Sequence, residues 1–448
     1  MSGAPRITTC AAALLLSAVC MVAPALAQTG GTSSADKKSD DGDAAALTLA
    51  DQTTAKPEQA SDWRFYTEAA LRESRPTGPG LGLHSDRLSF DLRYDGTLAP
   101  GLRAVFADHY DANRGDGFPT ALPGTQDVNT LKEAYLSWQP AADRVLDAGR
   151  INVRNGVATG YNPTDFFKTN AIRAVDSLDP ASLRENRLGT GMLRGQALWD
   201  SGSVTAIYAP RLASQPNNAT WSPDLGATNA RQRWQFALTQ KIAGGLSPQW
   251  LLSGGDGISP QLGLNLTALI GHSTVAYVEW SGGRSRSLLA QALALAPALA
   301  PTNDDTAFRS RLASGLSYTT SNNITFTAEY DYNGAGLDQA GWKRLWRAPP
   351  ATYLAYRAYT GAQQDPPTKQ GVFLYALWQD ALVKNFDLTA FVRYDAEDYS
   401  RLQWLEARYH WTHVDLALQT QLNNGTPASD YGVLPERRVW QAVLRYYF

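Results

Sequence analysis

Beyond an N-terminal segment, the chain repeats stretches of about ten residues in which apolar and polar side chains alternate. In residues 324–332 every even position is apolar or aromatic, whereas the odd positions are Thr325, Thr327, Glu329 and Asp331. A period of two places these two sets on opposite faces of a β-strand. The pattern therefore predicts a sheet with one apolar and one polar face, which a transmembrane barrel or a soluble sandwich could each provide.

Eighteen segments carry this pattern, and the connections between them favour the barrel. Connections after odd-numbered segments are mostly long, and those after even-numbered segments are short, which is typical of bacterial outer-membrane barrels with long outer loops and short periplasmic turns. An even strand number places both termini on the periplasmic side. The ninth and tenth segments are the weakest, and without them sixteen would remain. The predicted strands span residues 62–73, 86–97, 101–111, 130–139, 143–152, 188–199, 202–210, 230–241, 247–254, 258–270, 273–282, 308–319, 322–332, 369–381, 385–396, 400–411, 413–422 and 437–448.

Composition excludes two other classes of protein. After residue 27, no stretch approaches the ~18–20 apolar residues that a membrane-spanning helix needs, which excludes a helical membrane protein. The formal net charge of -2 argues against a nucleic-acid partner, which would require a strongly basic face.

The N-terminal sequence predicts a cleaved secretory signal over residues 1–27. Arg6 is its only charge, an apolar stretch follows, and Ala25-Leu26-Ala27 provides a small-residue cleavage site. Cys10 and Cys20 both lie inside it, so the mature chain contains no cysteine. Residues 28–61 are rich in Ser, Thr, Asp, Lys and Ala and are expected to form a flexible periplasmic segment with a possible short helix over 44–50. The barrel is expected to span residues 62–448.

The chain ends in an amphipathic stretch, Val439 to Phe448, with a terminal Phe. This ending resembles the signal by which outer-membrane barrels are recognised and inserted, so the expected partners are the barrel-assembly machinery, membrane lipid and lipopolysaccharide, with a homo-oligomer possible. Aromatic residues near strand ends suit interfacial girdles. They are Trp138, Trp199, Tyr208, Trp280, Tyr318, Tyr332, Trp378, Tyr394, Trp411 and Phe448.

If the apolar faces contact lipid, the opposite faces line a lumen with both signs of charge, and nearly all of its basic residues are Arg. One interpretation is a polar conduit whose charges orient solutes, since the Arg fork suits carboxylates and phosphates. The other is that individual charges pair across strands and stiffen the wall. The lumen and constriction candidates are Arg87, Arg93, Glu133, Arg150, Arg154, Asp165, Lys168, Arg194, Arg309, Arg311, Glu329, Arg393, Asp395, Arg408 and Arg445.

Two connections stand out. Residues 153–187 carry five basic and four acidic residues and the turn sequence Asn162-Pro163-Thr164-Asp165. This loop either folds inward as a constriction or packs on outer neighbours. Residues 283–307 contain an Ala/Leu run, 288–296, of helical propensity. It could dip into the lumen or the outer leaflet, but a helical cap on neighbouring loops is the simpler interpretation.

Catalytic patterns are scarce. His410 and His413 are the only closely spaced histidines, and three residues apart on an extended chain they face opposite ways. No hydrolase, zincin, phosphate-loop or dinucleotide motif occurs. We therefore expect no catalytic residue, metal or cofactor, although a hydrolase assembled from separate strands would leave no linear signature.

Glu133-Ala134-Tyr135-Leu136, followed by Ala148-Gly149-Arg150 and a long loop, resembles the strand pair that precedes the inward loop in eighteen-stranded alginate-export channels. The resemblance implies an outer-membrane channel architecture. Residues 160–167 depart from the alginate-exporter pattern, so the substrate does not carry over. The sequence predicts a porin-like channel that passes small polar or anionic solutes through a charged lumen narrowed by residues 153–187. The alternatives are an exporter of a polysaccharide or hydrophobic compound, or a sealed barrel acting as a hydrolase or surface anchor.

Overall fold

The computed structural model describes residues 61–78, 80–115, 126–242, 246–296, 298–299 and 304–448. The predicted signal sequence and the following segment as far as residue 60 lie outside these described residues. The short helix expected over 44–50 lies outside them as well.

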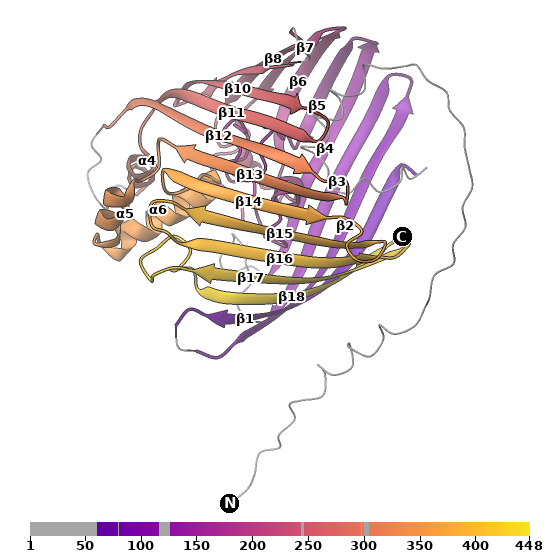
Figure 1. Cartoon of the computed structure of the whole chain (residues 1–448). Helices are drawn as coiled ribbons and strands as arrows, with labels where there is room; N and C mark the ends of the chain where they lie inside the picture. The colour runs from indigo at the N-terminus through magenta and orange to yellow at the C-terminus, as the bar shows by residue number, and fades with distance from the viewer. Residues whose placement is uncertain (1–60, 79, 116–125, 243–245, 297, 300–303) are drawn as a thin grey trace, which may run out of the picture. The chain divides into compact units, whose positions relative to one another are not determined.

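Eighteen antiparallel strands form one closed sheet, as the alternation predicted (Figure 1). Each strand pairs with its neighbours in the chain, and β1 pairs with both β2 and β18. The two weakest predicted strands are both present, so the number is eighteen rather than sixteen. The strands are β1 (Trp63–Pro76), β2 (Leu83–Ala99), β3 (Leu102–Gly115), β4 (Asp127–Ala141), β5 (Arg144–Ile151), β6 (Thr190–Trp199), β7 (Gly202–Ala209), β8 (Arg233–Gln240), β9 (Gln249–Gly255), β10 (Ile258–Ile270), β11 (Thr274–Ser285), β12 (Ala307–Thr319), β13 (Ile324–Asn333), β14 (Gln370–Trp378), β15 (Phe386–Asp395), β16 (Arg401–His410), β17 (Val414–Asn424) and β18 (Glu436–Tyr447).

Closure depends on the register between the first and last strands. Tyr66 lies opposite Tyr447, and the ladder continues to Arg75 opposite Arg438. The amide of Phe448 donates to the carbonyl of Phe65 at 3.1 Å, and the two rings lie 4.8 Å apart. A closed ladder leaves no strand edge, which a sheet surrounded by lipid requires because unpaired backbone groups are costly there.

The two faces of the sheet differ as the sequence predicted. Most inward positions are polar, small or charged, for example Ser89, Asp111 and Glu279, all fully buried. An exception is a buried apolar cluster on β14, β15 and β16. Of the aromatics expected in girdles, Trp138, Trp199, Tyr208, Tyr318, Trp411 and Phe448 are exposed. The outward face carries large exposed apolar side chains, among them Leu88, Phe106, Leu136, Leu193, Phe236, Leu262, Leu316, Leu374, Leu405, Leu418 and Leu444.

The long connections lie at one end of the barrel and hold the helices, which lie away from the C-terminus (Figure 1). Among the described residues no helix has both the length and the apolar character needed to cross a membrane. The helices are α2 (Pro180–Glu185), α3 (Leu225–Thr228), α4 (Leu288–Ala294), α5 (Gln339–Trp346) and α6 (Pro350–Gln363).

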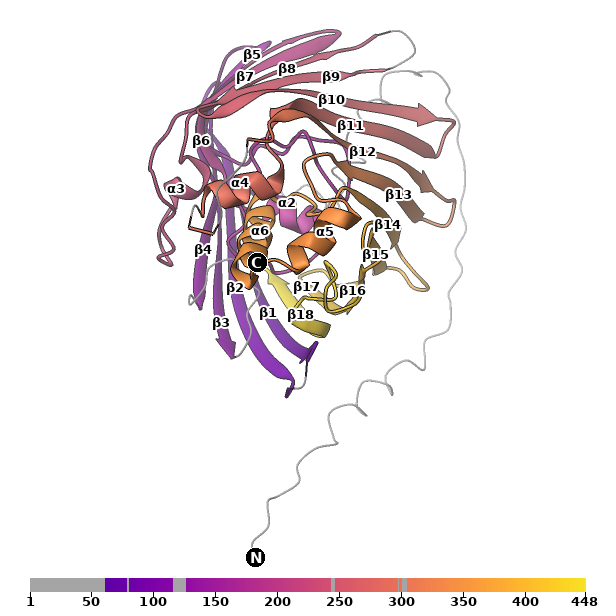
Figure 2. The ribbon, with the colours of Figure 1, turned by 90° about the vertical axis from the view of Figure 1, so that its left-hand side faces the viewer.

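Helices α4, α5 and α6 pack together, and we call them the helical cap. Its core contains Leu288, Ala292, Trp342, Leu345 and Tyr356. Seen from the long-loop end, these helices lie within the ring of strands (Figure 2). The Ala/Leu run of α4 therefore packs on neighbouring loops, as the simpler interpretation of the sequence expected.

Substitutions on the outward face test whether that face contacts lipid. Leu374 lies midway along β14 and is about half exposed, so Leu374→Arg should cost ~2–4 kcal/mol of unfolding free energy, the cost of Arg at the middle of a bilayer. Tyr318→Arg, at the end of β12, should cost only ~0–1 kcal/mol because that depth is interfacial. Denaturant unfolding in lipid vesicles measures both. Equal costs at the two depths would contradict lipid contact along this face.

Candidate functional site

The connection between β5 and β6, residues 152–189, crosses the barrel interior, and we call it the inward loop. Its backbone amides bind two carboxylates on strands far from β5. Val157 and Ala158 donate to Glu279 Oε2 at 2.9 and 3.1 Å, and the amide of Thr164 donates to Glu279 Oε1 at 2.8 Å. Glu279 lies on β11 and is fully buried.

Glu329 on β13 holds the next part of the inward loop. It accepts the amide hydrogens of Thr159, Gly160 and Tyr161 at 2.9 to 3.0 Å. The hydroxyl of Tyr277 also donates to Glu329, at 2.6 Å. A buried carboxylate is costly unless charge-assisted hydrogen bonds replace its water, and these amides supply them. The backbone amides of the inward loop thus provide the hydrogen bonds that stabilise the two buried glutamates.

A buried ion pair ties the inward loop to the segment that follows α6. Lys168 Nζ lies 2.8 Å from Asp365 Oδ1, and Arg311 Nε lies 3.6 Å from the other oxygen. Burial raises the pKa of Asp365, but Lys168 and Arg311 outweigh it and hold that pKa below its usual value. This stabilisation is complete above the ordinary carboxyl pKa and is lost as the pH falls through the lowered one. Nearby, the amide of Asn170 donates to the carbonyl of Ala362 in α6 at 2.8 Å.

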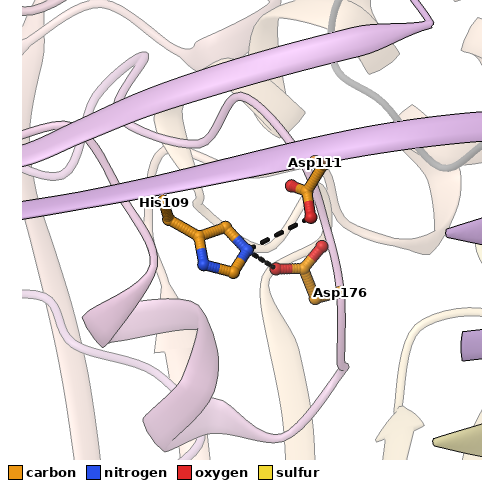
Figure 3. Close-up of side chains that lie close together, drawn as sticks. All are labelled: His109, Asp111 and Asp176. Atoms are coloured by element: carbon orange, nitrogen blue, oxygen red, sulfur yellow. Dashed lines mark hydrogen bonds and ion pairs between the residues drawn. The ribbon is translucent and has the colours of Figure 1, made fainter. Parts of the chain in front are cut away.

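Asp176 ties the far part of the inward loop to β2 through Arg87 and to β3 through His109, and the contact with His109 is drawn in Figure 3. Its oxygens lie 2.6 Å from Arg87 Nη1 and 2.9 Å from His109 Nε2. His109 also contacts Asp111 at 3.2 Å and, through Nδ1, Asp91 at 2.9 Å. Burial raises the pKa of Asp176, but Arg87 and then His109 outweigh it and lower the pKa.

The same cluster offers possible metal ligands. Atoms of His109, Asp111 and Asp176 lie within 4.8 Å of one another. Arg87 already contacts both carboxylates, at 2.6 Å from Asp176 and 3.7 Å from Asp111. A bound cation would have to compete with this guanidinium, so the arrangement is better explained as an ion-pair network that holds the loop.

An apolar contact completes the attachment. Leu178 packs against a buried cluster of Phe373, Phe391, Leu402 and Trp404, which projects inward from β14, β15 and β16. The inward loop is therefore held on several sides of the ring at once.

Most of the lumen candidates fall into two groups. Some contact the inward loop or belong to it: Arg87 and Glu329 as above, Lys168, Arg311, Asp165 in a 2.8 Å pair with Arg187, and Arg393, which donates to the carbonyl of Gly160 at 2.8 Å. Others form pairs along the wall: Arg93 with Glu133, Arg194 with Asp147, Arg309 with Asp305, Arg408 with Glu406 and Arg445 with Glu68, at 2.7 to 3.1 Å.

Three candidates have other surroundings. Arg150 is buried, and its Nη1 lies 3.4 Å from the carbonyl of Leu131. Arg154 is exposed. Asp395 accepts a hydrogen bond from Thr368 at 2.6 Å.

Several functional residues were not among the sequence candidates. Alternation assigns Glu279 to the lumen face, as it does Glu329, but Glu279 was not among the constriction candidates. Lys132 lies 2.5 Å from Asp91 because a β-bulge leaves it unpaired between Leu131 and Glu133 and turns it inward. Asp176 and Asp365 lie in loops, where no periodicity indicates direction.

Comparisons with known proteins support the fold. No family model matches the chain, and no curated protein matches it. Similar solved structures include OccK2 (OpdF) from Pseudomonas aeruginosa, with 10% identity, a TM-score of 0.53 and coverage of 86% of this chain and 98% of that one. Another structure of that protein, in complex with glucuronate, has a TM-score of 0.52 with 9% identity, over 86% of this chain and 97% of that one.

Two further structures have the same architecture. OccAB1 from Acinetobacter baumannii has 9% identity and a TM-score of 0.52, over 89% of this chain and 99% of that one. A BenF-like porin from Pseudomonas fluorescens Pf-5 has 11% identity and a TM-score of 0.52, over 86% and 98%. The fold is thus that of outer-membrane porins, and the finer resemblance to alginate exporters stays a prediction.

The Lys168–Asp365 pair generates a stability prediction. Asp365→Asn should cost ~3–5 kcal/mol of unfolding free energy because it leaves Lys168 buried without its counter-charge. Adding Lys168→Met should restore part of that loss, since both charges are then removed together. Denaturant unfolding measures each variant, with Asp304→Asn in an exposed pair as the control. A loss no larger than in this control would show that the pair does not hold the inward loop.

Proposed function

We propose that the protein is an outer-membrane channel through which small polar or anionic solutes diffuse, and that the inward loop forms its constriction. The loop crosses the lumen and is anchored by Glu279, Glu329 and Asp176. A solute moving along the barrel must pass the space that the loop leaves beside the wall.

The observation that carries the anionic preference is the unequal exposure of the wall pairs. In four of the five wall pairs the guanidinium is more exposed than its carboxylate, and in Arg309–Asp305 the order is reversed, at 18% and 39%. On balance the lumen surface is therefore more positive than the balanced charge count suggests. The similar structure in complex with glucuronate supports this choice, since glucuronate is a small anion. The exposed fractions of the Arg and acidic side chains are 25% and 5% for Arg445–Glu68, 27% and 14% for Arg93–Glu133, 22% and 1% for Arg194–Asp147, and 18% and 10% for Arg408–Glu406.

Single-channel recording in a planar bilayer under a salt gradient tests the proposal. We expect a steady current whose reversal potential shows anion selectivity. Arg93→Gln together with Arg445→Gln should reduce that selectivity, because Glu68 keeps Arg87 as a partner while the exposed guanidinium is lost. Arg144→Gln, an exposed residue at the turn end, is the control.

No current from a folded and inserted protein would overturn the channel and favour a sealed barrel. Cation selectivity in the unaltered chain would overturn the anionic preference alone.

The constriction has its own test. Glu279→Gln with Glu329→Gln replaces charged acceptors by neutral ones and weakens the bonds to the loop amides. We expect a larger and noisier current, as we do from deletion of residues 153–187. Glu73→Gln, an exposed position on β1, is the control. An unchanged conductance in both the double variant and the deletion would show that the inward loop does not limit the current.

A further inference from the structure

A cavity of about 230 Å³ lies at the long-loop end of the barrel, between the inward loop and the wall formed by β16, β17, β18 and β1. Residues 175–178 of the inward loop form one side of it. Its volume is below the ~300–1,000 Å³ of sites for drug-sized ligands, so it has room for one ring-sized group.

One side of this cavity is lined by amide side chains. Gln419 and Gln421 lie two residues apart on β17 and share its inward face, and Gln441 lies on the adjacent β18. Each amide nitrogen donates within the protein: Gln419 to Glu406 at 2.6 Å, Gln421 to Asn423 at 3.1 Å, and Gln441 to the carbonyl of Asp176 at 3.3 Å. No described residue donates a hydrogen bond to the three amide oxygens, which are left as acceptors for a ligand.

A further polar atom on the lining lacks a partner. Glu436 Oε1 is buried without a hydrogen bond to any described residue. Buried polar atoms are normally satisfied, so unused capacity beside a cavity indicates a bound polar group or water.

The other side of the cavity is apolar, with Leu178, Trp404 and Val439 on its lining. Charge on the lining is neutralised within the protein: Arg72 pairs with Glu436, and Asp176 pairs with Arg87. The guanidinium of Arg72 disfavours a cationic ligand. The cavity therefore suits a neutral group with hydroxyl donors on one face and C–H groups on the other.

We propose that this cavity binds one sugar ring or a cyclic polyol of that size. Its hydroxyls would donate to the oxygens of Gln419, Gln421 and Gln441, and its C–H face would lie against Leu178 and Trp404. The inference rests on the proposed channel, in which the cavity is an outer subsite beside the inward loop, but binding itself does not require conduction.

The test measures the binding of D-glucose to the full chain in detergent by calorimetry, and its block of the single-channel current from the long-loop side. Fully O-methylated glucose keeps the ring and loses every hydroxyl donor. We expect glucose to bind and to block the current transiently, and the methylated sugar to do neither.

Variants separate the cavity from the rest of the lumen. Gln421→Leu and Gln441→Leu each remove one acceptor and should weaken glucose binding about tenfold, as the loss of one buried hydrogen bond implies. Gln196→Leu is the matched control, because Gln196 bonds to Thr205 away from the cavity. It should leave binding unchanged.

The outcomes distinguish the two proposals. Glucose binding without any ion current would overturn the channel and support the subsite. A steady current with no glucose binding, equal binding of the methylated sugar, or equal loss in Gln196→Leu would overturn the subsite and leave the channel standing.

Discussion

The architecture of the lumen depends on backbone amides that solvate two buried carboxylates. Glu279 and Glu329 are buried, and the backbone amides of six residues of the inward loop between Val157 and Thr164 donate hydrogen bonds to them. Each partner needs the other: without the carboxylates the amides would be unsatisfied, and without the loop the glutamates would be costly to bury. This mutual requirement explains how an irregular segment can hold a defined course across a wide barrel.

The same principle orders the rest of the wall. Carboxylates such as Glu68 and Asp147 are almost fully buried, and each orients an arginine whose guanidinium remains more exposed. In these pairs the acidic residue positions the basic one, and the guanidinium is the more accessible charge of the pair. An arginine held in this way loses little further conformational freedom when it contacts an anion.

The fold was predictable from the sequence because its signal is local. A period of two fixes the direction of each side chain without knowledge of any partner, and all eighteen strands lie where alternation indicated them. The site was less predictable. The bulge that turns Lys132 inward depends on the partner strand, the direction of Asp176 and Asp365 depends on loop geometry, and the pairing of Val157 with Glu279 joins residues 122 positions apart. Alternation marks Glu279 and Glu329 as inward-facing but does not show that they accept amides of the loop rather than face an open lumen.

The inward loop and the residues that anchor it lie far apart in the sequence, and this determines when the loop can form during folding of the barrel. The loop contacts Arg87 on β2, Glu279 on β11, Asp365 before β14 and Arg393 on β15, and the bond from Arg393 to Gly160 spans 233 positions. Local contacts form early in folding and such distant ones late, because chain entropy must be lost first. The loop cannot reach its native course until strands from both halves of the chain stand in one ring. The barrel therefore closes before the inward loop narrows its lumen. An unfinished barrel would be wider inside than the mature protein.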